Sequence, residues 1–428
     1  MGRKRVFLPL VILVLALALG GCQVTDLLPR NAPDTPVPAA VPLPSPRPTV
    51  PQQPTGNVSP TAVPASPTGP TLSPAAGPTR VVPPAGSIQL PPGFGISVYA
   101  EGLNGPRMIA LGPDGFLYVA ERGAGRIVRL PDRDGDGVSD KVEVVAPGLN
   151  APSSINFHPD GSLYVGETDR ILRLSEPAAQ GVFQKQEVIV PGLPTGGHNT
   201  RTVLFSPDGR WLFVSIGSSC NVCQEQDPRR ATIMRYAVDG ADGTIFAQGL
   251  RNAVGITFRP GTSDLWASCN GRDNLGDDLP PETIDLVHQG DDYGWPRCHA
   301  GRIVDPDFGG SGACDGVAKP AVEMQAHSAP LGLTFYTGQQ FPAEYRGSLF
   351  VAFHGSWNRS VPTGYKVVHI PFVDGRPGPV EDFAVGWLQA DGSVWGRPVD
   401  VLTAPDGSLW VSEDSAGTIY RIFYSGIK

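Results

Sequence analysis

The sequence has few charged residues and no excess of cations. Asp, Glu, Lys and Arg make up 17% of the chain, and 41 acidic against 33 basic residues leave a formal net charge of -8. An acidic protein repels phosphate backbones, which argues against nucleic acid as a partner. Few charges together with 53 glycines are typical of many short strands and turns, and not of long helices with Glu- and Lys-rich surfaces.

The N-terminal apolar run, Val6 to Leu19, is shorter than the ~20 residues needed to span a bilayer. It follows the basic residues 3–5, as in an export signal. The sequence Leu-Gly-Gly-Cys22 resembles the cleavage box of bacterial lipoproteins, so we expect residues 1–21 to be a lipoprotein signal peptide and Cys22 to carry the lipid. An ordinary signal peptide is the alternative. The protein would be exported and held by its lipid alone at the outer face of the cell membrane, or on its periplasmic side.

Aromatic residues are almost absent from residues 22–86, which are rich in Pro, Ser and Thr. Of the 46 prolines, 18 fall between Pro29 and Pro84. Such a segment cannot form a core and is typical of an extended, disordered tether. The remaining residues, 87–428, have a normal length for one large all-β domain.

Cysteines are few, and only one Cys-x-x-Cys pair is present. Without a second pair, and with Gln224 after the first, neither a zinc site nor covalent haem is expected. Disulfides are permitted outside the cytoplasm, so Cys220 with Cys223, and Cys298 with Cys314, are disulfide candidates. The remaining cysteine of the domain, Cys269, is expected to be a buried free thiol.

A hairpin motif recurs along the domain. Four clear copies contain Pro-Asp-Gly: Leu111–Val119, Phe157–Val165, Phe205–Val214 and Thr403–Val411. Two degenerate copies are Phe258–Trp266 and Phe341–Val351. Proline presets φ, aspartate caps the turn and glycine takes a positive φ, so each copy predicts a β-hairpin.

The spacing of these hairpins predicts a propeller. Pro113, Pro159 and Pro207 lie 46 and 48 residues apart, close to the ~40–50 residues of a four-stranded blade. A solenoid would need capping ends, whereas a propeller closes on itself. The sequence therefore predicts an all-β fold, a six-bladed β-propeller of four-stranded antiparallel blades over residues 87–428, preceded by the tether.

One loop has carboxylates at alternating positions, as in an EF-hand calcium loop. They are Asp132, Asp134, Asp136 and Asp140, followed by Glu143. Because no helical pattern flanks them, we expect a structural calcium site, with a solvated acidic turn as the alternative.

A histidine lies in the loop Gly196–Arg201, directly before an apolar strand. Two glycines before an imidazole let the main chain approach a ligand, and histidine can accept a proton near neutrality. On these six residues alone, a loop histidine satisfied by a neighbour is the favoured interpretation. Four arginines recur at comparable points of the repeats, which in a propeller surround one central mouth: Arg201, Arg251, Arg359 and Arg397. Such a ring of cations suggests a bound polyanion.

An ordered set of motifs resembles the pyrroloquinoline quinone (PQQ)-dependent sugar dehydrogenases of the glucose/sorbosone dehydrogenase family. The motifs are Gly-Gly-His198-Asn-Thr-Arg, Gly-Leu-Arg251-Asn252, Asn-Gly-Arg-Asp273, Gly-Asp-Asp-Tyr-Gly-Trp-Pro296, His-Gly-Ser-Trp-Asn-Arg359 and Gly-Arg397. They cover essentially the whole domain. The resemblance implies a six-bladed propeller that binds PQQ and calcium and oxidises the anomeric carbon of an aldose or related sugar.

The resemblance also implies roles for residues. His198 would be the general base during hydride transfer to PQQ, and Arg251 would stabilise charge on the quinone oxygen. The residues that would bind the cofactor are Asn252, Arg201, Arg397 and either Arg359 or Lys366. Main-chain oxygens of Asn270, Gly271 and Arg272 would hold a calcium ion that polarises the quinone.

The sequence departs from the family pattern at Val399, where soluble glucose dehydrogenases carry a second cofactor-pairing arginine. The cofactor-binding lysine has no obvious counterpart either. The resemblance implies a small sugar as substrate. No haem motif is present, so we expect electrons to pass to an external acceptor, a quinone or a cytochrome. The alternatives are a non-catalytic extracellular propeller that binds a protein or glycan, and a calcium-dependent propeller lactonase.

Overall fold

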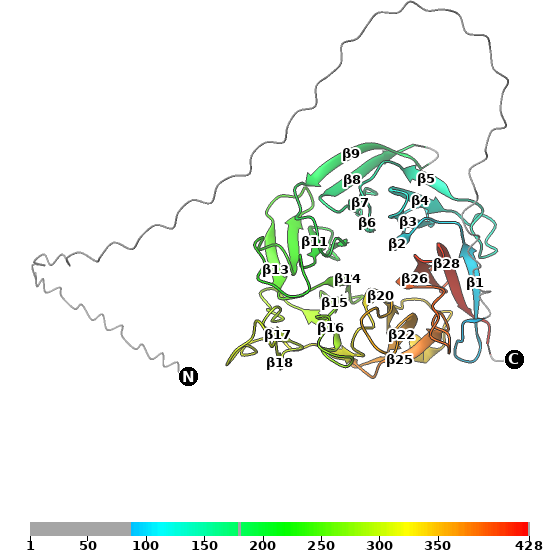
Figure 1. Ribbon diagram of the computed structural model, residues 1–428. Coiled ribbons are helices and arrows are strands. Elements are labelled where there is room, and N and C mark those ends of the chain that lie inside the picture. Colours follow the sequence, from blue (N-terminus) through cyan, green and yellow to red (C-terminus); the bar gives the residue numbers. More distant parts are fainter. Residues whose placement is uncertain (1–86, 179–180, 427–428) are drawn as a thin grey trace, which may run out of the picture. The chain divides into compact units, whose positions relative to one another are not determined.

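The computed structural model describes residues 87–178 and 181–426. The predictions for the signal peptide, for the lipidated Cys22 and for the tether lie outside these residues. Six four-stranded antiparallel sheets surround a central axis, so the predicted all-β six-bladed propeller is confirmed (Figure 1). In the part of the chain that is described, no helix is long and apolar enough to cross a membrane.

The blades follow one another along the chain, each with its innermost strand first. Blade 1 consists of β2 (Pro106–Leu111), β3 (Leu117–Glu121), β4 (Arg126–Leu130) and β5 (Glu143–Ala146), and blade 2 of β6 (Ser154–Phe157), β7 (Leu163–Gly166), β8 (Ile171–Pro177) and β9 (Phe183–Val190). Blade 3 consists of β10 (Arg201–Phe205), β11 (Trp211–Ile216), β12 (Thr232–Ala237) and β13 (Thr244–Gln248), and blade 4 of β14 (Ala253–Phe258), β15 (Leu265–Cys269), β16 (Glu282–Val287) and β19 (Val322–Met324). Blade 5 consists of β20 (Pro330–Phe335), β21 (Leu349–Phe353), β22 (Lys366–Ile370) and β25 (Glu381–Val385), and blade 6 of β26 (Pro398–Thr403), β27 (Leu409–Glu413), β28 (Thr418–Tyr424) and β1 (Phe94–Ala100).

Short elements decorate the long connections. Two small hairpins, β17 (Cys298–His299) with β18 (Ile303–Val304) and β23 (Phe372–Val373) with β24 (Arg376–Pro377), lie in blades 4 and 5, and a 3₁₀ turn, η2 (Ala343–Tyr345), precedes β21.

Five of the six predicted hairpins join the inner strand of a blade to the second strand. The prediction for Phe341–Val351 is wrong, because the inner strand β20 already ends at Phe335 and this segment holds the 3₁₀ turn η2 and the start of β21. The pairs that close the four clear copies are Leu111 with Leu117, Phe157 with Leu163, Phe205 with Leu212 and Thr403 with Leu409. The glycine of each Pro-Asp-Gly turn has φ between 70° and 85°, a region that side chains with a Cβ rarely adopt. The Pro-Asp-Gly motif therefore sets the register between the inner and second strands in blades 1, 2, 3 and 6.

The ring is closed by strand β1, which pairs antiparallel with β28, so the last blade takes its outer strand from the start of the domain (Figure 1). The Phe94 ring meets Phe341, Tyr345, Phe383 and Tyr424 edge-on at centroid distances of 4.8–5.1 Å. This aromatic cluster joins blade 5 to the closing strand.

An apolar cluster lies on the inner strands. It contains Met108, Val254, Leu331 and Val399, which come from β2, β14, β20 and β26. Val399, the position at which the resembling family carries an arginine, is fully buried in this cluster. A guanidinium at this point would lose its hydration without gaining a partner, which accounts for the apolar residue.

Buried glutamates fix the loops at one end of the propeller. Glu121, Glu167 and Glu413 each end or directly follow the second strand of a blade and are fully buried. Each accepts the main-chain N–H of a residue that precedes the inner strand of the same blade, at 2.5–2.7 Å. Such charge-assisted bonds hold the loops that form the mouth.

The closing strand β1 should contribute to the stability of the propeller through Phe94. We expect Phe94→Ala to lower the free energy of unfolding by roughly 3 kcal/mol, because a large ring is removed from an aromatic cluster. Phe308→Ala, which truncates a ring that is 41% exposed, should change it by less than about 0.5 kcal/mol. Urea unfolding followed by circular dichroism measures both, and equal effects would contradict the closing role of Phe94.

Candidate active site

A cavity of about 590 Å³ lies at the mouth of the propeller. Its wall is built by residues that precede or begin inner strands or that follow second strands: Gly105, Arg107, Arg122, Gly123, Ala151, Gly197, His198, Asn199, Thr200, Asn252 and Asp414. Because neighbouring strands of a blade are antiparallel, these positions share one end of the ring. The structure thus brings His198 and Asn252 together, although 54 residues separate them in the sequence.

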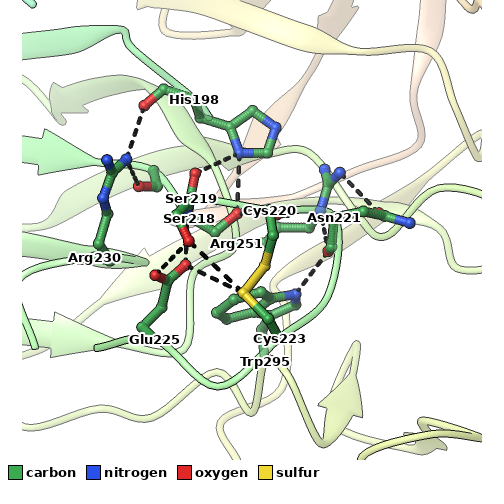
Figure 2. The surroundings of a disulfide bond; sticks show 11 residues. His198, Ser218, Ser219, Cys220, Asn221, Cys223, Glu225, Arg230, Arg251 and Trp295 are labelled. Carbon is green, nitrogen blue, oxygen red and sulfur yellow. Dashed lines mark hydrogen bonds between the residues drawn. A yellow bond between two sulfur atoms is a disulfide. The ribbon is translucent and has the colours of Figure 1, made fainter. Parts of the chain in front are cut away.

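The His198 ring is partly buried against the chain that follows β11. Its Nδ1 lies 3.0 Å from Ser218 Oγ and 3.1 Å from the Ser218 carbonyl oxygen (Figure 2). A Cβ on Gly217 would come within 2.6 Å of the His198 Cβ and 2.5 Å of Asn252 Oδ1, so a glycine is needed where these two side chains meet. Gly197 serves packing as well, since its Cβ would lie 2.3 Å from the Ser219 carbonyl oxygen.

Burial and nearby cations keep His198 uncharged. Burial first, and then the positive charges of Arg251, Arg230 and Arg201, lower the pKa of His198 from 6.5 to about 4. The imidazole is therefore neutral and able to accept a proton over the whole neutral range.

Arg251 is buried and fully engaged. Its guanidinium donates to the Asn221 main-chain oxygen and to Asn221 Oδ1, both at 2.9 Å, and pairs with Asp273 Oδ2 at 2.6 Å. Arg251 thus lies beside the His198 pocket, but it does not line the 590 Å³ cavity.

The other predicted cofactor-binding cations have internal partners and do not line this cavity. Arg201 donates to the carbonyl oxygens of His198 and Thr200, Arg397 to those of His354 and Gly355, and Arg359 to the carbonyl oxygen of Asp277. Lys366 pairs with Asp382 on the outer strand of blade 5. The position of the arginines in the repeat predicts that they lie at the same end of the propeller, but it does not predict the direction of their side chains.

Two cations that the sequence interpretation missed line the cavity: Arg107 and Arg122. Arg107 pairs with Asp414 Oδ2 at 2.7 Å, and His354 Nε2 lies 3.0 Å from Asp414 Oδ1. The repeat could have indicated that Arg122 lies at the mouth. Arg122 and Asp414 each follow the glutamate of a Leu-aromatic-Val-small-Glu motif, so they occupy comparable positions in two blades.

The mouth has a surplus of positive charge. Burial and the charge of Arg107 lower the pKa of Arg122, and burial together with Arg230, Arg122 and Arg229 lowers the pKa of Arg201 to about 10. Arginines that depress one another's pKa favour an anion between them.

The predicted calcium segment at the mouth offers main-chain oxygens only. Asn270 Oδ1 accepts a hydrogen bond from Asn252 Nδ2 at 3.2 Å, and Asn270 Nδ2 donates to the Pro330 carbonyl oxygen at 2.6 Å. The Gly271 main-chain N–H donates to Glu282 Oε2 at 2.6 Å. The Arg272 guanidinium pairs with Asp305 and Asp307. None of these side chains is available to a metal.

The acidic loop of blade 1 gathers three carboxylates. Asp132, Asp134 and Asp136 place one oxygen each within 4.8 Å of one another. Asp140 and Glu143, which were predicted to join them, instead pair with Arg133. An ion there would have three carboxylates and main-chain or water oxygens as ligands.

The structure contains two disulfides, Cys220–Cys223 and Cys298–Cys314, and a buried free thiol at Cys269. Burial raises the pKa of the Cys269 thiol, so this side chain is an inert core residue.

The TrAA12-like family model matches residues 88–302 and 310–425. The chain belongs to the TrAA12-like family. An uncharacterised protein of Borreliella burgdorferi is 35% identical to this TrAA12-like chain over 235 residues, 54% of this chain and 62% of that protein. A PQQ-dependent pyranose dehydrogenase of Coprinopsis cinerea is 28% identical over 405 residues, 77% of this chain and 54% of the relative. This TrAA12-like chain thus spans between half and two thirds of the length of these curated relatives.

Among solved structures, the holo form of the pyranose dehydrogenase PQQ domain of Coprinopsis cinerea superposes on this TrAA12-like propeller with a TM-score of 0.70. The sequences are 24% identical, and the match covers 78% of this chain and 97% of that domain. The likeness shows that the two share a fold.

We predict that the acidic loop of this TrAA12-like propeller binds Ca²⁺. Ca²⁺ should raise the melting temperature of the protein by several degrees, because an ion that binds only the folded state stabilises it. The double substitution Asp134→Asn and Asp136→Asn should reduce this shift by the part that the acidic loop contributes, while Asp391→Asn, in another exposed turn, should keep the shift unchanged. Differential scanning calorimetry with Ca²⁺ or with chelator measures the shift, and no response in the wild type would leave a solvated acidic turn.

Proposed function

We propose that the protein is a PQQ-dependent sugar dehydrogenase that oxidises an aldose or related sugar at its anomeric carbon. The observation that carries the proposal is the cavity itself, where an imidazole kept neutral by burial faces a surplus of arginines in an otherwise acidic protein. A neutral base and fixed cations in one pocket are what proton removal beside an anionic cofactor requires.

The cavity fits a cofactor with several carboxylates. Its volume of about 590 Å³ falls within the ~300–1,000 Å³ typical of ligand sites. Arg107 and Arg122 supply cations at the wall, and Asn252 and Asn199 supply amides. PQQ, when bound, would supply the two-electron acceptor for the hydride.

His198 would remove the proton from the anomeric hydroxyl of the sugar. The ring lies on the cavity wall, and its low pKa leaves a free nitrogen lone pair at neutral pH. A positioned general base contributes on the order of 10²–10⁴-fold to a rate. Arg251, held by Asn221 and Asp273, would keep a fixed positive charge beside the reacting atoms.

We also propose that main-chain oxygens of Asn270, Gly271 and Arg272 bind a Ca²⁺ ion. Carbonyl oxygens are ligands that Ca²⁺ accepts, and the ion would act as a Lewis acid. Electrons would pass to an external acceptor, a quinone or a cytochrome. We further propose that the enzyme acts outside the cell membrane on a small sugar, attached by the lipid on Cys22.

Reconstitution tests the function. Adding PQQ and Ca²⁺ to the apoprotein should restore quinone absorption and sugar-dependent dye reduction. His198→Gln should abolish turnover while PQQ still binds, whereas His288→Gln, at an exposed histidine paired with Asp291, should leave turnover unchanged. If no quinone absorption appears, a non-catalytic propeller that binds a protein or glycan replaces the enzyme, and a calcium-dependent hydrolysis of lactones without PQQ would identify a lactonase.

The pH profile tests the base. Because the pKa of His198 is lowered to about 4, kcat/KM should stay high as pH falls through 6.5 and decline only near pH 4, where the imidazole becomes protonated. Steady-state kinetics of the reconstituted protein between pH 4 and 8 measures this limb. A decline centred at pH 6.5 would show that the histidine is not held neutral.

A further inference from the structure

The Cys220–Cys223 disulfide closes a loop that contacts both candidate catalytic side chains. Residues 218–223 follow β11 and belong to no strand, and the two cysteines are three residues apart. Figure 2 shows the His198 ring bonded to Ser218 and the Arg251 guanidinium bonded to Asn221, two residues of this loop. Neither cysteine can ligate a metal, since both sulfur atoms are in the bond.

Ser218 determines which nitrogen of His198 carries the proton. The Ser218 hydroxyl donates its hydrogen to the Cys220 carbonyl oxygen at 2.6 Å. It can therefore only accept from His198 Nδ1, and so can the Ser218 carbonyl oxygen, the other atom near Nδ1. Two acceptors at Nδ1 require a proton on that nitrogen, which leaves Nε2 as the basic nitrogen.

Asn221, inside the closed loop, determines the position of Arg251. Its main-chain oxygen and its Oδ1 accept two N–H groups of the guanidinium, and Trp295 Nε1 donates to the same main-chain oxygen at 3.2 Å (Figure 2). Asn221 Nδ2 donates to the Asp273 carbonyl oxygen at 3.0 Å, so the loop and the carboxylate partner of Arg251 are fixed together.

The far end of the loop is anchored as well. Glu225 accepts the main-chain N–H of Ser219 at 2.6 Å and the Ser219 hydroxyl at 2.7 Å. A disulfide across so short a segment removes conformations that would break these contacts.

We propose that the disulfide-closed loop Ser218–Cys223 is the positioning element of the site. Ser218, through the Cys220 carbonyl, makes Nε2 of His198 the proton acceptor, and Asn221 orients the Arg251 guanidinium. The inference rests on the proposed function for its consequence in catalysis, but the tautomer and the loop geometry do not depend on a bound cofactor. Arg251, Arg230 and Arg201 are the cations whose charges lower the pKa of His198.

The tautomer can be measured in the apoprotein. With ¹⁵N-labelled histidine, the His198 resonances are those lost in His198→Gln, and long-range ¹H–¹⁵N spectra distinguish a protonated Nδ1 from a protonated Nε2. We expect protonated Nδ1 in the wild type and a mixture of tautomers in the double variant Cys220→Ser and Cys223→Ser. Protonated Nε2 in the wild type would overturn the proposal even if the variant failed to fold.

The matched control removes the other disulfide. Cys298→Ser with Cys314→Ser should leave the His198 tautomer as in the wild type, because among the described residues no hydrogen bond joins Cys298 or Cys314 to the Ser218–Cys223 loop. An equal change in both double variants would assign the effect to general loosening of the fold and would contradict the proposal.

Kinetics of the PQQ-reconstituted protein supply the second readout. The Cys220→Ser and Cys223→Ser variant should lose roughly 10- to 100-fold in kcat, the size of effect expected when a reacting group is misplaced by about 1 Å, with KM for the sugar nearly unchanged. Unchanged kcat with an unchanged tautomer would overturn the proposal. If the wild type oxidises no sugar but the His198 tautomer depends on the Cys220–Cys223 disulfide, the dehydrogenase function is contradicted and the positioning role of the loop is supported.

Discussion

Pairing of β1 (Phe94–Ala100) with β28 is the constraint on which the rest of the propeller depends. Five blades are each built from one continuous segment of the chain, with a small hairpin inserted in blades 4 and 5. The sixth blade takes three strands from the end of the domain and its outer strand, β1, from the start (Figure 1). A closed ring leaves no long sheet edge and fixes the angle between neighbouring blades. The loops before the six inner strands converge on one mouth only because this ring is closed.

Within the ring, buried carboxylates hold the mouth and arginines give it its charge. Glu121, Glu167 and Glu413 bind main-chain N–H groups before the inner strands of their blades, so the loops that carry the cavity wall are attached to the sheets. Arg107 and Arg122 can then lie close together without a full set of counter-charges. The repulsion between these two guanidinium groups lowers the stability of the free protein, and a bound anion would offset it. Such charge arrangements are common at functional sites.

The sequence predicted the fold in detail because Pro-Asp-Gly turns are local features. Each copy specifies its own hairpin, and the spacing specifies the blade. It also predicted the convergence of His198 and Asn252, since comparable positions of a repeat lie at one end of a propeller. It did not predict that Arg122 rather than Arg201 lines the cavity, because side-chain direction depends on partners far away in the sequence. The role of Ser218 was likewise invisible, since a serine after a strand has no signature of its own.

Cofactor, general base and cations would share one cavity at the mouth of the propeller. The most direct test is a crystal structure of the protein soaked or grown with PQQ and Ca²⁺. The account predicts quinone density in the 590 Å³ cavity, between His198 and Arg122, with a carboxylate of the ligand within hydrogen-bond distance of a guanidinium. Density in another cavity, such as the one of about 420 Å³ beside Trp295 and Phe308, would contradict it.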